Sequence, residues 1–153
     1  MYETLLTLHN LLRWAVLIAA VVALARVLPG LSGRRAWTGA DRAAGAAYTG
    51  LVSLQVVLGL LLYVGLSPLI RVIFTDFGAA MRDPQLRFFA VEHIFAMILA
   101  AVLATLGGAL ARRRATDLGK FRAAALCYGL SLLIIVIAIP WWRPLLRLWG
   151  YAT

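Results

Sequence analysis

Four long apolar runs are the feature that most constrains the fold of this 153-residue chain. They extend over about residues 5–28, 44–66, 88–111 and 121–139, and each is followed closely by a proline or by arginines. A helix of about 20 apolar residues crosses the roughly 30 Å hydrocarbon core of a bilayer. We therefore predict an all-α integral membrane protein, a four-helix bundle in up-down-up-down order that forms a single domain over residues 1–153.

The composition agrees with a membrane protein and excludes several other classes. Hydrophobic residues make up 63% of the chain, charged residues 14%, and the mean hydropathy is +0.91. A soluble domain has about 45–50% apolar and about 25% charged residues, so a cytosolic enzyme and a disordered tail are both excluded. The single cysteine, Cys127, can form no internal disulfide. The net charge of +9 lies at the ends of the apolar runs, which is typical of membrane orientation signals and not of nucleic-acid binding.

The distribution of Lys and Arg predicts the orientation. Nine of the 15 flank the first and third loops, and six lie on the opposite side. The nine are Arg26, Arg34, Arg35, Arg42, Arg112, Arg113, Arg114, Lys120 and Arg122. The six are Arg13, Arg71, Arg82, Arg87, Arg143 and Arg147. Because cytoplasmic loops carry the excess of basic residues, we expect both termini to lie outside.

The segment between the second and third spans, residues 67–87, is more than a linker. Its apolar residues include Ile70, Ile73 and Phe77, with Arg71 and Asp76 between them. This pattern predicts a short helix that lies in the outer membrane interface.

The two histidines of the chain fall at matching depths. His9 lies about four residues into the first span and His93 about five residues into the third, and these two spans run in the same direction. At 1.5 Å per residue, both lie roughly 6–8 Å below the same boundary. The first and third helices of such a bundle are diagonal or adjacent across the core. Two imidazoles placed in this way can ligate one iron from opposite sides, which predicts one non-covalently held b-type haem.

Charged residues near the histidines fit a haem site. Arg13 follows His9 by four residues and shares its helix face, one turn deeper. A charge inside a span costs about 2.5–3.5 kcal/mol, so we expect Arg13 to have a partner, either Glu92 or a haem propionate, unless it snorkels to the surface. Arg87 lies nearer the interface, where the propionates would point.

Three further residues of the spans are candidates for contacts in the bundle. Gly59 and Gly129 would let a flat macrocycle approach the second and fourth helices, although small residues also serve helix packing. Gln55, in the middle of the second span, is expected to hydrogen-bond another helix, with a role in a proton or quinone path as the alternative.

Other interpretations of the histidines remain open. Either imidazole alone could bond a lipid headgroup or a backbone carbonyl. Met97 follows His93 by four residues, and a thioether with two imidazoles would suit Cu(I). The H-E-x-x-H order of catalytic zinc sites, the P-loop and the Rossmann fingerprint are absent from the sequence.

Several segments resemble those of a family of small bacterial four-span membrane proteins that carry a loose cytochrome b-like label. They are LHNLLRW at 8–14, RFFAVEH at 87–93, KFR at 120–122 and IPWW at 139–142. The chain also resembles bacterial cytochrome b561 in its four spans and early histidine. That family holds two haems with histidines on further helices, whereas the second and fourth spans here contain none, so one haem is the maximum. The resemblance implies a bacterial inner-membrane location, His9 and His93 as the axial pair, and Arg13 and Glu92 as supporting residues.

Three functions are compatible with these features. The first is an electron carrier, or a component of a quinol-linked oxidoreductase, with haem b between spans 1 and 3 near the outer face. The second is a non-catalytic accessory subunit of a larger respiratory or photosynthetic membrane complex. The third, a small transporter or channel, has little support because the spans offer almost no polar path. Candidate partners are the lipid bilayer, quinone, other membrane subunits and a second copy in a homodimer, with no nucleic acid.

Overall fold

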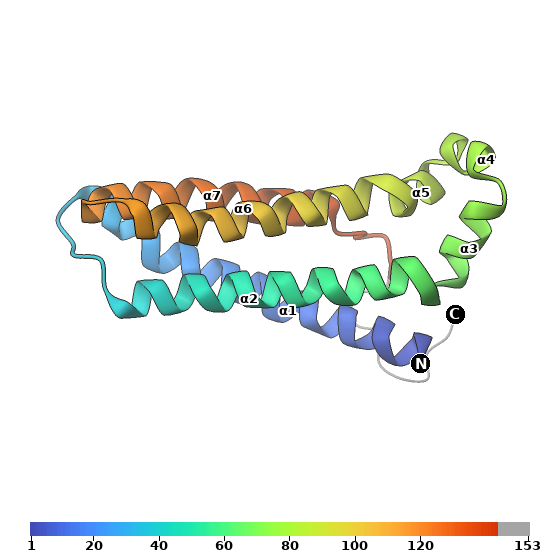
Figure 1. Ribbon diagram of the computed structural model, residues 1–153, viewed down its shortest axis with the longest axis horizontal. Coiled ribbons are helices and arrows are strands. Elements are labelled where there is room, and N and C mark those ends of the chain that lie inside the picture. Colours follow the sequence, from blue (N-terminus) through green and yellow to red (C-terminus); the bar gives the residue numbers. More distant parts are fainter. Residues whose placement is uncertain (144–153) are drawn as a thin grey trace.

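Four long helices that alternate in direction form the molecule in the computed structural model, which describes residues 1–143 (Figure 1). The four are α1 (Tyr2–Val27), α2 (Gly39–Leu61), α6 (His93–Arg113) and α7 (Asp117–Ala138). A 3-10 turn, η1 (Leu28–Ser32), extends α1, while the π-helical turns η2 (Leu62–Leu66) and η3 (Phe88–Glu92) continue α2 and precede α6. No strand occurs in residues 1–143, so the all-α four-helix prediction is confirmed. Arg147, counted above among the outer cations, lies outside the described residues.

The helices pack in a ring in which α1 and α6 are diagonal. Contacts join α1 to α2, α2 to α6, α6 to α7, and α7 back to α1. Figure 1 shows the α1–α2 pair beside the α6–α7 pair, with the N-terminus and the short helices at one end. Residues carried by α1 and α6 can therefore face each other only across the centre of the bundle.

The predicted spans coincide with four helices long and apolar enough to cross a membrane. These helical stretches are Tyr2–Ser32, Gly39–Leu66, Pro84–Arg113 and Asp117–Ala138. Large apolar side chains cover their outer faces, for example Ile18, Phe95 and Ile137, which are 64%, 69% and 71% exposed. Such a surface matches lipid, because a helix that crosses a bilayer satisfies its backbone internally and turns apolar side chains outward. The protein is a multi-pass membrane protein.

The segment predicted as one short interfacial helix forms three. They are α3 (Pro68–Thr75), α4 (Phe77–Arg82) and α5 (Pro84–Arg87). Each starts at a polar cap: Ser67, Asp76 and Asp83 accept hydrogen bonds from the backbone N–H groups of the first turn. Because such caps favour a new helix start, the two aspartates divide the segment.

The bundle is tightly packed towards the end that holds the first and third loops. Alanines that are fully buried fill the space between the helices there: Ala20, Ala23, Ala100, Ala104 and Ala124. The Tyr128 ring fits between the helices there because it lies against glycine. A Cβ atom on Gly107 would lie 2.6 Å from Cε1 of Tyr128, and one on Gly45 would overlap the Tyr128 hydroxyl.

A buried carboxylate organises the same end of the molecule. Asp41, fully buried in the first turn of α2, accepts hydrogen bonds from Arg26, Arg35 and Thr38. With Thr38 it forms a capping box that starts α2. This pairing joins the end of α1 to the beginning of α2.

Candidate functional site

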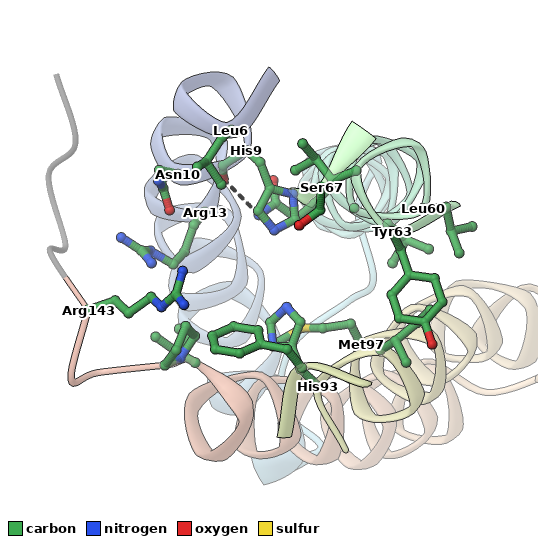
Figure 2. Close-up of a pocket in the computed structure, with 18 of the residues that line it drawn as sticks. Leu6, His9, Asn10, Arg13, Leu60, Tyr63, Ser67, His93, Met97 and Arg143 are labelled. Atoms are coloured by element: carbon green, nitrogen blue, oxygen red, sulfur yellow. Dashed lines mark hydrogen bonds between the residues drawn. The ribbon is translucent and has the colours of Figure 1, made fainter. Parts of the chain in front are cut away.

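The other end of the bundle encloses a cavity of about 500 Å³ lined by all four long helices (Figure 2). Its volume falls within the roughly 300–1,000 Å³ typical of ligand-binding pockets. The lining comes from the first half of α1, the last half of α2 with η2, the start of α6 and the end of α7. Because buried alanines close the core between the helices at the loop end, the space inside the bundle lies at this end.

His9 and His93 face each other across this cavity. Figure 2 shows the two rings pointing toward one another from α1 and α6. Their centroids are 6.5 Å apart and the ring planes make an angle of 69°. Two imidazoles on opposite sides of one metal ion, with metal–nitrogen bonds of about 2.0–2.1 Å, place their centroids about 6–6.5 Å apart. The separation suits a shared metal ion.

The tautomer of His93 is set by the end of α7. Its Nδ1 lies 2.8 Å from the carbonyl oxygen of Ala138, the last residue of α7. A carbonyl oxygen can only accept, so Nδ1 carries the hydrogen and Nε2 keeps its lone pair. Metal-binding histidines commonly have their second nitrogen held in this way.

Two polar atoms near His9 have no partner among the described residues. His9 Nδ1 and Gln55 Oε1 are both buried and make no hydrogen bond, although Gln55 Nε2 donates to the His9 carbonyl oxygen at 2.8 Å. That bond confirms the predicted contact of Gln55 with another helix. Unpaired buried polar atoms are rare in folded proteins, so two beside one cavity indicate a place where a ligand or side-chain rearrangement completes the site.

Gly59 gives the His9 ring its position. A Cβ atom at residue 59 would lie 3.2 Å from Cε1 of His9, closer than ordinary van der Waals contact. At Gly59 the group that approaches the helix closely is the His9 ring, and the approach of a macrocycle to this glycine stays a prediction. Gly129 has no atom within 4 Å of its Cβ position and is not part of the cavity lining, so it lies away from the site.

Two π-helical turns flank the cavity, a feature for which the sequence carries no simple signal. The hydroxyl of Tyr63 in η2 donates to the carbonyl oxygen of Ala90 in η3 at 2.7 Å, which ties the turns together. Tyr63 and Phe89 both line the cavity. Single π-helical turns occur frequently at functional sites, because the extra residue redirects the side chains that follow.

Arg87 and Glu92 lie apart from the cavity and bind each other. Arg87 Nε donates to Glu92 Oε1 at 2.7 Å, and both side chains are about half exposed. In the π-helical turn between them, residues five apart share a face, which explains this pairing. The Glu92 carboxylate is therefore bonded to Arg87. Arg87, which we expected beside a haem propionate, is not among the residues that line the cavity.

Among the described residues, Arg13 and Arg143 are the cationic side chains that line the cavity. Arg13 is buried, and the guanidinium of Arg143 lies 4.4 Å from the centre of the Phe89 ring. Figure 2 shows both guanidinium groups on the same side of the cavity, next to Asn10. From the sequence, Arg143 is expected only as one of the six basic residues on the outer side. The sequence signal that could have placed Arg143 beside the cavity is Pro140, three residues earlier, where the chain turns back.

Met97 and aromatic side chains complete the walls. Met97 lines the cavity one turn along α6 from His93. Phe88 and Phe89 lie 5.6 and 6.2 Å from the His93 ring, and Trp142 lies 4.8 Å from Phe88. The walls are thus mainly apolar and aromatic, and the two imidazoles, the two arginines and Gln55 are among the polar groups that line them.

No protein-family model matches the chain, and neither a curated protein nor a solved structure matches it. The chemistry of the site is therefore argued from its donors. No group of three or more His, Cys, Asp or Glu side chains suited to a metal ion occurs in residues 1–143. Two imidazoles alone would leave a metal ion in need of further ligands, which a prosthetic group such as a haem would supply.

Proposed function

We propose that the protein is a membrane electron-transfer protein that holds one b-type haem between α1 and α6. The observation that carries this proposal is the pair His9 and His93, with ring centroids 6.5 Å apart across a cavity of about 500 Å³. When bound, a haem supplies one-electron oxidation and reduction of its iron.

The residues of this chain would hold and tune the group. His93 presents Nε2 to the cavity because the Ala138 carbonyl engages Nδ1. His9 is positioned by Gly59, and His9 and Gln55 both line the cavity, each with a buried polar atom that has no partner among the described residues. The mainly apolar walls would surround a bound haem with groups of low polarity, and burial, ligation and nearby charge tune the potential of a haem.

Arg13 and Arg143 supply the positive charge that haem propionates require. Both line the cavity on one side, as Figure 2 shows, whereas Arg87 is paired with Glu92. Guanidinium groups bind carboxylates in bidentate fashion, so this side of the cavity is the favoured place for the propionates.

We place the protein in the bacterial inner membrane with both termini outside, from the excess of basic residues on the first and third loops. The haem site then lies near the outer face. One haem in one leaflet would exchange electrons with a quinol in the bilayer or with a redox partner at the outer surface, including another membrane subunit or a second copy. A single site does not provide a path across the full membrane.

A reduced-minus-oxidised absorption spectrum of the protein purified in detergent from haem-replete cells tests the proposal. We expect a b-type signal with about one haem per chain by pyridine haemochrome. His9→Ala and His93→Ala should each remove the signal while circular dichroism shows the helices intact. Met97→Leu is the matched control, because it keeps the cavity volume and should retain the haem.

Two results would contradict the haem assignment. A colourless wild-type protein from such cells is the first, and unchanged haem content in His93→Ala is the second. Copper that is present in place of haem, and lost in Met97→Leu, would instead identify a Cu(I) site built from His9, His93 and Met97. A colourless protein that copurifies with other subunits would identify an accessory subunit.

A further inference from the structure

We infer that an acidic phospholipid binds in a groove between α2 and α6 at the arginine-rich end of the bundle. The groove has a volume of about 340 Å³ and is separate from the histidine cavity, which lies at the opposite ends of the same two helices. The inference is independent of the haem proposal, because the two sites share no lining residue.

Two arginines stand at the mouth of the groove, one from each helix. Arg42 lies in the first turn of α2 and Arg112 in the last turn of α6, and both are exposed. Neither takes part in an ion pair among the described residues. No carboxylate lines the groove, because the neighbouring Asp41 is fully buried against Arg26 and Arg35. The mouth therefore carries positive charge without a counter-ion from this part of the protein.

The groove continues from the mouth into the membrane-spanning part of the helices. Small residues, among them Gly45 and Gly50 of α2 and Gly108 of α6, line it. Gly50 follows Arg42 by eight residues, so the groove extends about 12 Å along the helix axis. A Cβ atom on Gly50 would meet nothing within 4 Å, so this wall is open.

The two threonine hydroxyls inside the groove are already hydrogen-bonded. The Thr49 hydroxyl donates to the carbonyl oxygen of Ala104 at 3.2 Å, and the Thr105 hydroxyl donates to that of Ala101 at 2.8 Å. The interior thus offers methyl and methylene surface, while the mouth offers two guanidinium groups. This combination matches an acyl chain joined to an anionic headgroup, and basic pockets between spanning helices bind such lipids.

Other occupants match these features less well. A free phosphate ion would use the arginines but leave the apolar groove unfilled. A second copy of the chain, docked by the same surface about a two-fold axis, would bring the same arginines together. We therefore commit to a lipid with a net negative headgroup, such as phosphatidylglycerol.

Native mass spectrometry with dioleoylphosphatidylglycerol or dioleoylphosphatidylcholine in mixed micelles measures the binding. Each arginine near an anionic headgroup contributes about fivefold, so we expect about 30-fold tighter binding of the anionic lipid. Arg42→Gln with Arg112→Gln should remove this preference. Arg34→Gln with Arg113→Gln is the control, because it removes equal charge at the same end from residues outside the groove lining.

A second pair of variants tests the groove itself. Gly50→Leu should fill the groove and lower retention of the anionic lipid. Gly129→Leu is the control: it also adds a side chain in open space, but on α7 and outside the groove, so lipid retention should be unchanged. Equal binding of the two lipids, or the same loss in both arginine pairs, would overturn the inference. So would unchanged binding in Gly50→Leu, full competition by inorganic phosphate, or a dimer mass in place of a lipid adduct.

Discussion

Individual small residues decide where the polar groups of the cavity lie. Gly59 leaves room for the His9 ring, and Gln55, four residues earlier on the same helix face, bonds the His9 backbone. His93 is held from the other side by a helix-terminal carbonyl. The two imidazoles thus have different supports, so changes at α2 should affect His9 and leave His93 in place.

Substitution of Gly59 tests the support of His9. A Cβ atom there would lie 3.2 Å from His9 Cε1, and the larger leucine side chain would occupy the space of the ring. We expect Gly59→Leu to weaken haem retention by at least about 10-fold, as changes in groups that orient metal ligands do. Haem content per chain measures this effect. Gly129→Leu, with open space around it, should retain normal content, and normal content in Gly59→Leu would contradict the role of Gly59.

A buried hydroxyl chain is the second residue-scale feature. Ser131 Oγ donates to the Ala100 carbonyl oxygen at 2.7 Å, so its single hydrogen is used, and the Tyr48 hydroxyl must donate to Ser131 at 2.6 Å. All three residues are buried. The chain links α2, α6 and α7 at one level of the bundle.

Removal of the central hydroxyl should leave Tyr48 without an acceptor. We expect Ser131→Ala to destabilise the protein by about 1–2 kcal/mol, which corresponds to a fall of about 2–8 °C in melting temperature. Thermal unfolding in detergent measures the change. Thr105→Ala is the control, because the exposed Thr105 hydroxyl donates to the Ala101 carbonyl oxygen of its own helix and links no second helix. Equal melting temperatures for Ser131→Ala and the wild type would show that the hydrogen bonds contribute nothing net.

At the scale of the helices, the sequence predicts the elements well and their irregularities poorly. Length and hydropathy locate all four spans, and equal depth on parallel helices brings His9 to His93. The π-helical turns leave no such signal, because an extra residue in a turn changes neither length nor hydropathy appreciably. For that reason the pairing of Arg87 with Glu92 was not foreseen.

Close contact between α6 and α7 depends on glycine at a second position. A Cβ atom on Gly107 would lie 2.6 Å from Cε1 and 2.8 Å from Cδ1 of Tyr128, a fully enclosed ring. Gly107→Ala should therefore push the helices apart and destabilise the protein by about 1–3 kcal/mol. The melting temperature measures this, and Gly50→Ala, into open space, is the matched control. Equal stability of both alanine variants would show that Tyr128 moves freely.

At the scale of the whole molecule, the two ends of the bundle differ in packing and charge. Alanine and glycine close the core at the loop end, where the buried Asp41 neutralises part of the arginine charge. The other end is hollow, with the histidines and Arg13 inside. In lipid, burial of apolar surface gives no net driving force, and close packing of small residues holds helices together instead. The tightly packed end can therefore keep the four helices associated although the other end is hollow.

The orientation of these two ends determines on which side of the membrane electrons would be exchanged. The excess of arginine on the first and third loops predicts that those loops are cytoplasmic and that α4 is outside. In a Cys127→Ala background, Gly78→Cys and Ala115→Cys place single exposed thiols at the two ends. A membrane-impermeant maleimide applied to spheroplasts should modify Gly78→Cys at once, and Ala115→Cys only after permeabilisation. The reverse pattern would place the histidine cavity next to the cytoplasm, and its redox partner would then have to be a cytoplasmic or inner-leaflet one.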